Sequence, residues 1–161
     1  MRGFRCFIES VGIDYFDSSA LLAARNQSSK SRELLIDMDI DDFLRLAESG
    51  RSGDKERGVN DLLSSGVKFS SIPFLGVGFS DSDPFAMQVR SHEGRHRARA
   101  LKRIGIKTMP VRIIHDSIRW GGQISSDNYD YVDKFPTHFV SEGGGEVVPF
   151  GVTREDLASR F

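Results

Sequence analysis

Residues 92–101, His-Glu-Gly-Arg-His-Arg-Ala-Arg-Ala-Leu, concentrate the residue types of this chain that can do chemistry. A polar turn with a glycine leads into a basic segment in which Ala98, Leu101 and Ile104 recur at helical spacing, and we expect these three residues in the core. The first N–H groups of a helix have no acceptor within the helix and lie at its positive end. Arginines beside such amides suit phosphate or another anion. The pattern therefore predicts an anion-binding turn at the start of a short helix.

Each residue of this turn has a candidate role. Glycine lets the backbone approach a ligand and adopt positive φ, arginine can bind two phosphate oxygens at once, and histidine can donate to phosphate or carry a proton near neutral pH. Glu93 can be a general base, a magnesium ligand or a group that orients an arginine, and the arginines around it would weaken it as a base. We therefore predict Glu93 and His96 as catalytic residues and, as phosphate ligands, Gly94, Arg95, His96, Arg97 and Arg99, with His92 and His115 as outer residues.

A competing interpretation needs no ligand. The same cations can form a solvated helix start with ion pairs to acidic neighbours, and Arg99, Lys102 and Arg103 fit an exposed helical face better than a site. His115 with Asp116 fits a polar strand end better than a catalytic pair. The acidic residues between 127 and 133 match no metal-binding loop and fit a solvated loop better.

The segments around the turn predict a compact single α+β domain with a small mixed sheet. Alternating and apolar runs predict strands at 4–11, 33–38, 72–79, 85–90 and 109–114. Helical spacing predicts helices at 20–25, 40–48 and 55–64, with Val59, Leu62 and Leu63 facing inward, and a basic helix that Gly105 ends. Asp39 and the Thr153–Asp156 pair have the spacing of helix caps. The segment 28–32 and the glycines at 143–145 are predicted loops.

We predict one domain over residues 1–116, with its core at 33–115, and a Gly- and aromatic-rich extension, 117–161, packed on the same domain. Its 161 residues suffice for one hydrophobic core. Cys6 is the only cysteine, so an internal disulfide is impossible and a reducing, cytoplasmic setting is expected. No apolar run is long enough to cross a bilayer, so no membrane partner is expected.

Charge is unevenly distributed along the chain. The net charge is −1, yet residues 90–112 hold eight Arg or Lys residues and one acid, Glu93. This window carries +7, which leaves −8 for the remainder. A basic window on an otherwise acidic protein favours a local anionic ligand over tracking along a duplex.

The run Gly94–Ala100, followed by the proline-led segment Lys107–Val111, resembles the ParB/sulfiredoxin superfamily. Gly94, Arg97, Arg99 and Ala100 match the G-E-R-R-x-R-A box of ParB-type domains, and the D-G-H-H-R box of the free-serine-kinase branch is also similar. Arg95 departs from the pattern: it replaces the ParB glutamate and the catalytic cysteine of sulfiredoxin. The resemblance covers residues 72–115, and more weakly 33–66. It implies a turn that binds nucleotide phosphates; different branches hydrolyse CTP, phosphorylate serine, reduce sulfinic cysteine or act as nucleases.

Three functions remain open on the sequence alone. The first is a ParB-like protein of phage or plasmid type that binds a nucleotide or another phosphate ligand, with Mg²⁺ as its cofactor. This protein could also perform NTP hydrolysis, phosphoryl transfer or nuclease chemistry. The second is a DNA-binding module without catalysis, which the basic window favours. The third is a protein-interaction module that contacts its partner through residues 117–161.

Overall fold

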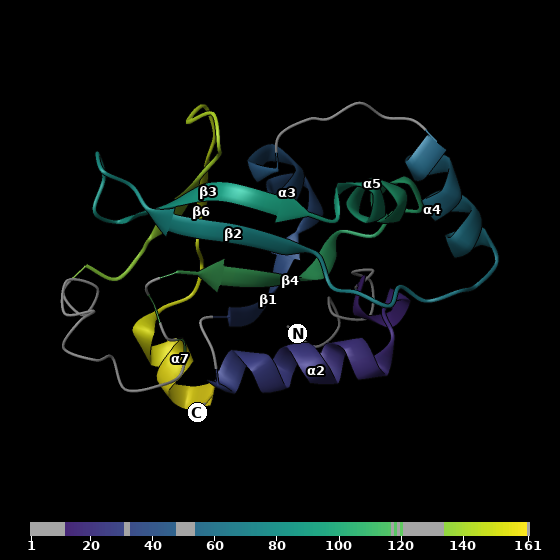
Figure 1. Cartoon of the computed structure of the whole chain (residues 1–161), viewed down its shortest axis with the longest axis horizontal. Helices are drawn as coiled ribbons and strands as arrows, with labels where there is room; N and C mark the ends of the chain where they lie inside the picture. The colour runs from purple at the N-terminus through teal and green to yellow at the C-terminus, as the bar shows by residue number, and fades with distance from the viewer. Residues whose placement is uncertain are drawn as a thin grey trace, which may run out of the picture.

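The computed structural model describes residues 12–30, 33–47, 54–116, 118, 120 and 134–160. This part of the chain is α+β, built on a curled six-stranded mixed sheet with the strand order β1-β4-β2-β3-β5-β6 (Figure 1). The strands are β1 Glu33–Asp39, β2 Phe74–Phe79, β3 Ala86–Glu93, β4 Thr108–His115, β5 His138–Val140 and β6 Val147–Pro149. The helices are the 3-10 helix η1 Gly12–Tyr15 and the α-helices α2 Ser18–Lys30, α3 Ile40–Leu46, α4 Asp54–Ser64, α5 Arg95–Arg103 and α7 Arg154–Arg160.

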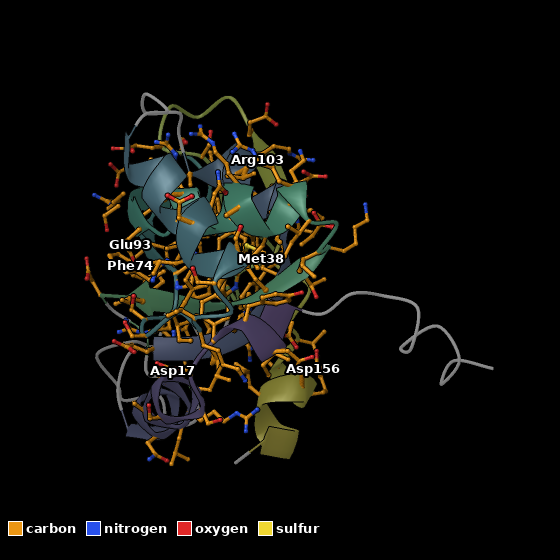
Figure 2. All side chains as sticks on the ribbon, turned by 90° about the vertical axis from the view of Figure 1, so that its right-hand side faces the viewer. Asp17, Met38, Phe74, Glu93, Arg103 and Asp156 are labelled. Atoms are coloured by element: carbon orange, nitrogen blue, oxygen red, sulfur yellow. The ribbon has the colours of Figure 1, made fainter. Side chains whose placement is uncertain are left out.

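The strand pairing brings the ends of several strands together near the start of α5. β4 pairs antiparallel with β1 and parallel with β2, and β2 pairs antiparallel with β3. The register sets Phe74, the first residue of β2, opposite Glu93, the last residue of β3, and Figure 2 shows the two side by side. In Figure 1, α4 and α5 lie together at this end of the strands, while α2 runs beneath β1. Glu93, at the end of β3, therefore lies directly before the first turn of α5.

Most predicted elements are confirmed, with two informative differences. β3 continues to Glu93, so His92 and Glu93 belong to a strand and not to the polar turn expected from their composition. α2 extends to Lys30 and takes in part of the predicted loop at 28–32, so that prediction is wrong at its beginning. β5 and β6 were not predicted. The predicted strand at 4–11 and Cys6 lie outside the described residues.

Two predicted helix caps are confirmed by hydrogen bonds. The Asp39 carboxylate accepts from the amides of Asp41 (2.9 Å) and Asp42 (3.2 Å). At α7, the Thr153 amide donates to Asp156 (2.8 Å) and the Asp156 amide donates to the Thr153 hydroxyl (3.1 Å), the reciprocal pattern of a capping box. Local spacing therefore specifies where α3 and α7 begin.

The core prediction for α5 is confirmed at two positions and wrong at the third. Ala98 and Leu101 are fully buried, whereas Ile104 is 50% exposed. The helix ends just before Ile104, and Gly105 then adopts a φ of +87°. This left-handed residue turns the chain, so Ile106 and not Ile104 points into the core.

Aromatic side chains attach the described C-terminal residues to the sheet. Phe150 contacts Trp120 (ring centroids 5.7 Å apart), Phe139 (5.4 Å) and Phe135 (6.1 Å). Trp120, Phe139 and Phe150 are all buried. β5 and β6 thus extend the same sheet and share its core.

Gly94 provides a stability test of the junction between β3 and α5. Its φ is +113°, and a Cβ added there would lie 2.4 Å from Pro73 Cβ and 2.9 Å from Pro73 Cα. We expect Gly94→Ala to lower the free energy of unfolding by roughly 2–4 kcal/mol, because backbone strain and a clash with a rigid ring add together. Chemical denaturation followed by circular dichroism measures this loss.

The matched control is Gly105→Ala. Gly105 also has positive φ, but an added Cβ would meet nothing within 4 Å. Only the backbone term applies there, so we expect a loss of about 1–2 kcal/mol. Equal losses in the two variants would show that the contact with Pro73 costs nothing.

Candidate functional site

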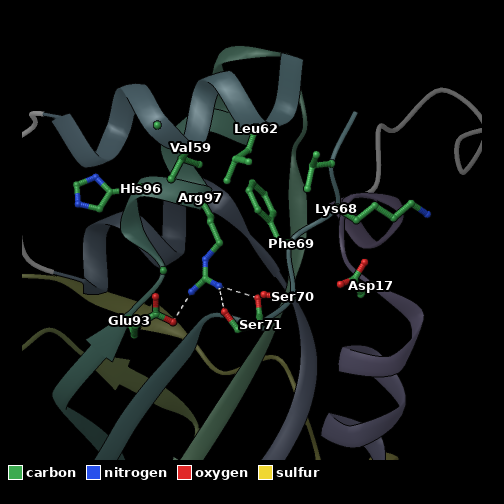
Figure 3. Close-up of a pocket in the computed structure, with 13 residues that line it drawn as sticks. Asp17, Val59, Leu62, Lys68, Phe69, Ser70, Ser71, Glu93, His96 and Arg97 are labelled. Carbon is green, nitrogen blue, oxygen red and sulfur yellow. Dashed lines mark hydrogen bonds and ion pairs between the residues drawn. The ribbon is translucent and has the colours of Figure 1, made fainter. Parts of the chain in front are cut away.

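A cavity of about 720 Å³ opens between α4, the segment 67–71 and the first turn of α5 (Figure 3). Most of its wall is apolar, and a few charged groups lie on it. Its lining comprises Asp17, Gly58, Val59, Leu62, Val67, Lys68, Phe69, Ser70, Ser71, Glu93, Gly94, His96 and Arg97.

The cavity gathers half of the residues that the sequence nominated. Glu93, Gly94, His96 and Arg97 line it; Arg95, Arg99, His92 and His115 are not among the lining residues. Because these four side chains lie elsewhere, the eight nominated residues do not form one site.

Arg97 is the most constrained of the lining side chains. It is only 9% exposed. Its Nη1 donates to the Ser71 carbonyl (2.7 Å) and to the Ser71 hydroxyl, and its Nη2 pairs with the Glu93 carboxylate. These contacts tie α5 to the end of β3 and to the segment before β2. Arg97 thus holds the wall together and does not present the open guanidinium fork expected from the sequence.

The same geometry defines the position of Glu93. Of the three roles considered from the sequence, orientation of an arginine is the one to which its contact with Arg97 corresponds. In the described part of the chain, no group of three or more His, Cys, Asp or Glu residues is arranged to hold a metal ion. The residues present therefore do not form a protein-built magnesium site.

His96 lies apart from this network. In Figure 3 its ring is separate from the group formed by Arg97, Glu93 and Ser71. Its Nδ1 is buried and has no hydrogen-bond partner among the described residues. His96 is therefore a residue of the cavity wall that is not joined to Glu93.

The remaining nominated residues have other surroundings. Arg95 and Arg99 are one helical turn apart, and burial, followed by the charge of Arg99, lowers the pKa of Arg95. His92 lies within β3 opposite Leu75. His115 is completely buried, with its ring between Phe79 (5.3 Å) and Trp120 (6.3 Å).

The other nine lining residues were not nominated from the sequence. Asp17 reaches the cavity because its amide donates to the Phe69 carbonyl (2.8 Å) and the Phe69 amide donates to the Tyr15 carbonyl (2.8 Å). No local pattern could reveal this pairing, since it joins segments far apart in the chain. The helical spacing of Val59 and Leu62 was visible, but it predicted core positions. Leu62 is instead 46% exposed and borders the cavity.

The first turn of α5 contributes backbone N–H groups that can bind a ligand in the cavity. Ala98 makes the first helical hydrogen bond, to the Gly94 carbonyl (3.0 Å). The amides between them have no acceptor within the helix. With Gly94, His96 and Arg97 on the wall, this helix start can receive an anion, while Val59, Leu62 and Phe69 can contact an apolar group.

The basic window does not form one continuous cationic surface. Arg112 pairs with Glu33 (2.6 and 3.0 Å) on the neighbouring strand β1. Lys102 pairs with Asp41 (2.6 Å), and this hydrogen bond is the main cause of the lowered pKa of Asp41. Arg90 donates to the Phe79 carbonyl (2.8 Å). These three cations of the window are thus engaged in separate contacts with acids and a carbonyl.

The role of Arg97 is testable through stability. Arg97→Ala would remove the donor that pairs with the Glu93 carboxylate and leave the Ser71 carbonyl without this bond. We expect a loss of about 1–3 kcal/mol in the free energy of unfolding, with partial recovery in Arg97→Lys, whose single ammonium cannot replace a fork. Urea denaturation measures both variants.

The control for this experiment is Lys107→Ala, an exposed cation outside the cavity. It should change stability by no more than about 0.5 kcal/mol. An Arg97→Ala variant as stable as this control would contradict the structural role.

Comparisons with protein-family models, curated proteins and solved structures found no match to this chain. Among the described helices, none combines the length and apolar character needed to cross a membrane. A function for the cavity is therefore argued below from its lining residues and from the sequence of residues 94–100.

Proposed function

We propose that this chain is a ParB/sulfiredoxin-like protein that binds a nucleotide or another phosphate ligand of similar size in the cavity between α4 and α5. The observation that carries the proposal is the position of the first turn of α5 on the wall of a cavity of about 720 Å³. Small-molecule sites typically have volumes of roughly 300–1,000 Å³, a mainly apolar wall and a few convergent polar groups. This cavity has each of these properties.

The phosphate end of the ligand would lie at the start of α5. The amides before Ala98 point toward the N-terminal end of the helix, where anions are stabilised. Lys68 lies on the same cavity wall and is exposed, and His96 lies on that wall as well. Arg97 contributes by fixing the turn.

The apolar end of the ligand would lie against α4 and the segment before β2. Val59, Leu62 and Val67 provide aliphatic surface, and Phe69 provides an aromatic ring. Phe69 is only 5% exposed, and its ring packs on Phe16 with centroids 5.3 Å apart, so it supports the wall from behind. Leu62 (46% exposed) and Val67 (49% exposed) supply the accessible apolar surface. A planar base or another flat ring suits such a wall.

The resemblance to the superfamily supports the same location. Gly94 and Arg97, two of the matched positions, both line the cavity, whereas Arg95, where this chain departs from the family, does not. The departure therefore leaves the cavity wall unchanged. We propose ligand binding without assigning a catalytic step, because Arg97 already engages the carboxylate of Glu93.

The DNA-binding alternative receives less support. Strong duplex binding requires many cations that can reach phosphates together. Arg97, Lys102 and Arg112 are instead paired with Glu93, Asp41 and Glu33. No contact in the described residues favours a protein partner for the segment 134–160.

Lys68→Gln tests the proposal. Isothermal titration of the folded protein with adenine and uracil nucleotides should give saturable binding, which inorganic phosphate weakens by competition. Lys68→Gln should lower the affinity by roughly three- to tenfold, because an exposed charge-assisted contact is lost. Lys107→Gln removes an exposed lysine outside the cavity and should bind as the unmodified protein does. Absence of binding to any phosphate ligand, or equal effects of the two variants, would refute the proposal.

A further inference from the structure

The charged groups on the cavity wall nearly balance. Two carboxylates, Asp17 and Glu93, and two cations, Lys68 and Arg97, line the cavity. Glu93 and Arg97 pair with each other, so their charges largely cancel within the wall. The ligand therefore meets one further cation, Lys68, one further anion, Asp17, and the partial positive charge of the α5 amides. Such a wall attracts a small negative charge and opposes a large one.

The backbone of Asp17 is anchored at the cavity. Its amide donates to the Phe69 carbonyl (2.8 Å), and its own carbonyl accepts from Leu21 (3.1 Å) in the first turn of α2. Figure 3 shows its side chain on the same side of the cavity as Lys68, across from Glu93 and Arg97. A ligand with a chain of phosphates running across the cavity would therefore bring negative charge toward this carboxylate.

Divalent cations often reduce such repulsion, because Mg²⁺ bridges phosphates and protein carboxylates. Here the Glu93 carboxylate already accepts from Arg97, and Asp17 lies on the opposite side of the cavity. The donor set thus lacks two converging carboxylates, and the described residues offer no cluster of three potential metal ligands. A single phosphate beside Lys68 and the α5 amides needs no metal ion to offset its charge, whereas the described wall residues offer a longer phosphate chain no carboxylate pair to hold Mg²⁺.

We infer that the cavity is selective for a phosphate monoester joined to a flat apolar ring, such as a nucleoside monophosphate, over di- and triphosphates, and that Asp17 is the residue that sets this selectivity. This inference rests on the proposed function. One phosphate would occupy the α5 amides with Lys68 beside it, and the ring would lie along Val59, Leu62 and Phe69. Binding would not require a divalent cation.

The first experiment compares ligands that differ only in phosphate number. Isothermal titration uses the full chain with adenosine, AMP, ADP and ATP, and with the corresponding uridine series, in EDTA and in Mg²⁺. The monophosphates should bind about tenfold or more tightly than the triphosphates in both buffers. They should also bind more tightly than the nucleosides, because the phosphate contributes to affinity.

The second experiment changes Asp17. Asp17→Asn removes the charge but keeps a side chain that favours the position before a helix. It should narrow the preference for monophosphate over triphosphate by at least about threefold, with most of the change in triphosphate affinity. Asp14→Asn is the matched control, since Asp14 is an exposed aspartate of η1 outside the cavity lining. Asp17→Ser provides a second neutral variant with a helix-capping side chain.

The outcomes distinguish a failure of the monophosphate selectivity from a failure of phosphate binding itself. Triphosphates that bind as tightly as monophosphates, or a preference unchanged in both Asp17 variants, would overturn the inference and leave phosphate binding intact. Nucleosides that bind as tightly as their monophosphates, or no binding by any ligand, would overturn the proposed function as well. A strict need for Mg²⁺ would also contradict the inference.

Discussion

The candidate site depends on one buried guanidinium. Arg97 joins three segments that approach from different directions: the first turn of α5, the last residue of β3 and the segment before β2. A buried cation is tolerated only when hydrogen-bonding partners replace its water shell. Ser71 and Glu93 supply those partners, and in doing so they fix the shape of the cavity wall. The hydrogen bonds of Arg97 therefore set the shape of this part of the cavity wall without any ligand.

Gly94 makes this arrangement sterically possible. β3 must turn sharply into α5 while Pro73 lies directly against the turn. Only a residue without a side chain can combine positive φ with so close a contact. The glycine at the start of the 94–100 run is thus explained by packing against proline, independently of any ligand. A phosphate site at this helix start would use a turn that the fold already requires.

Local patterns predicted much of the fold but only part of the site. Asp39 and the Thr153–Asp156 pair predicted helix starts because capping depends on neighbours within one turn. β5 and β6 escaped prediction because strands of three residues give almost no periodic signal. The pairing of Arg97 with Ser71 and the approach of Asp17 to Phe69 join distant segments, so spacing along the chain could not reveal them. Sequence composition correctly placed cations near a helix start, but it could not show which of them already had partners.

The charge of a site is decided by these partners and not by the count of cations in the sequence. A window with an excess of +7 suggests strong attraction for polyphosphates or nucleic acid. In the folded chain, Arg112 and Lys102 face acids of β1 and α3, and Arg97 faces Glu93. What remains at the cavity is close to neutral, with helix amides as the main positive feature. A nearly neutral wall can discriminate between ligands by their negative charge. Each added phosphate would be repelled by the Asp17 carboxylate, and the described lining residues hold no further cation to offset that repulsion. Selectivity for a singly phosphorylated ligand would then follow from the balance of paired charges on the wall.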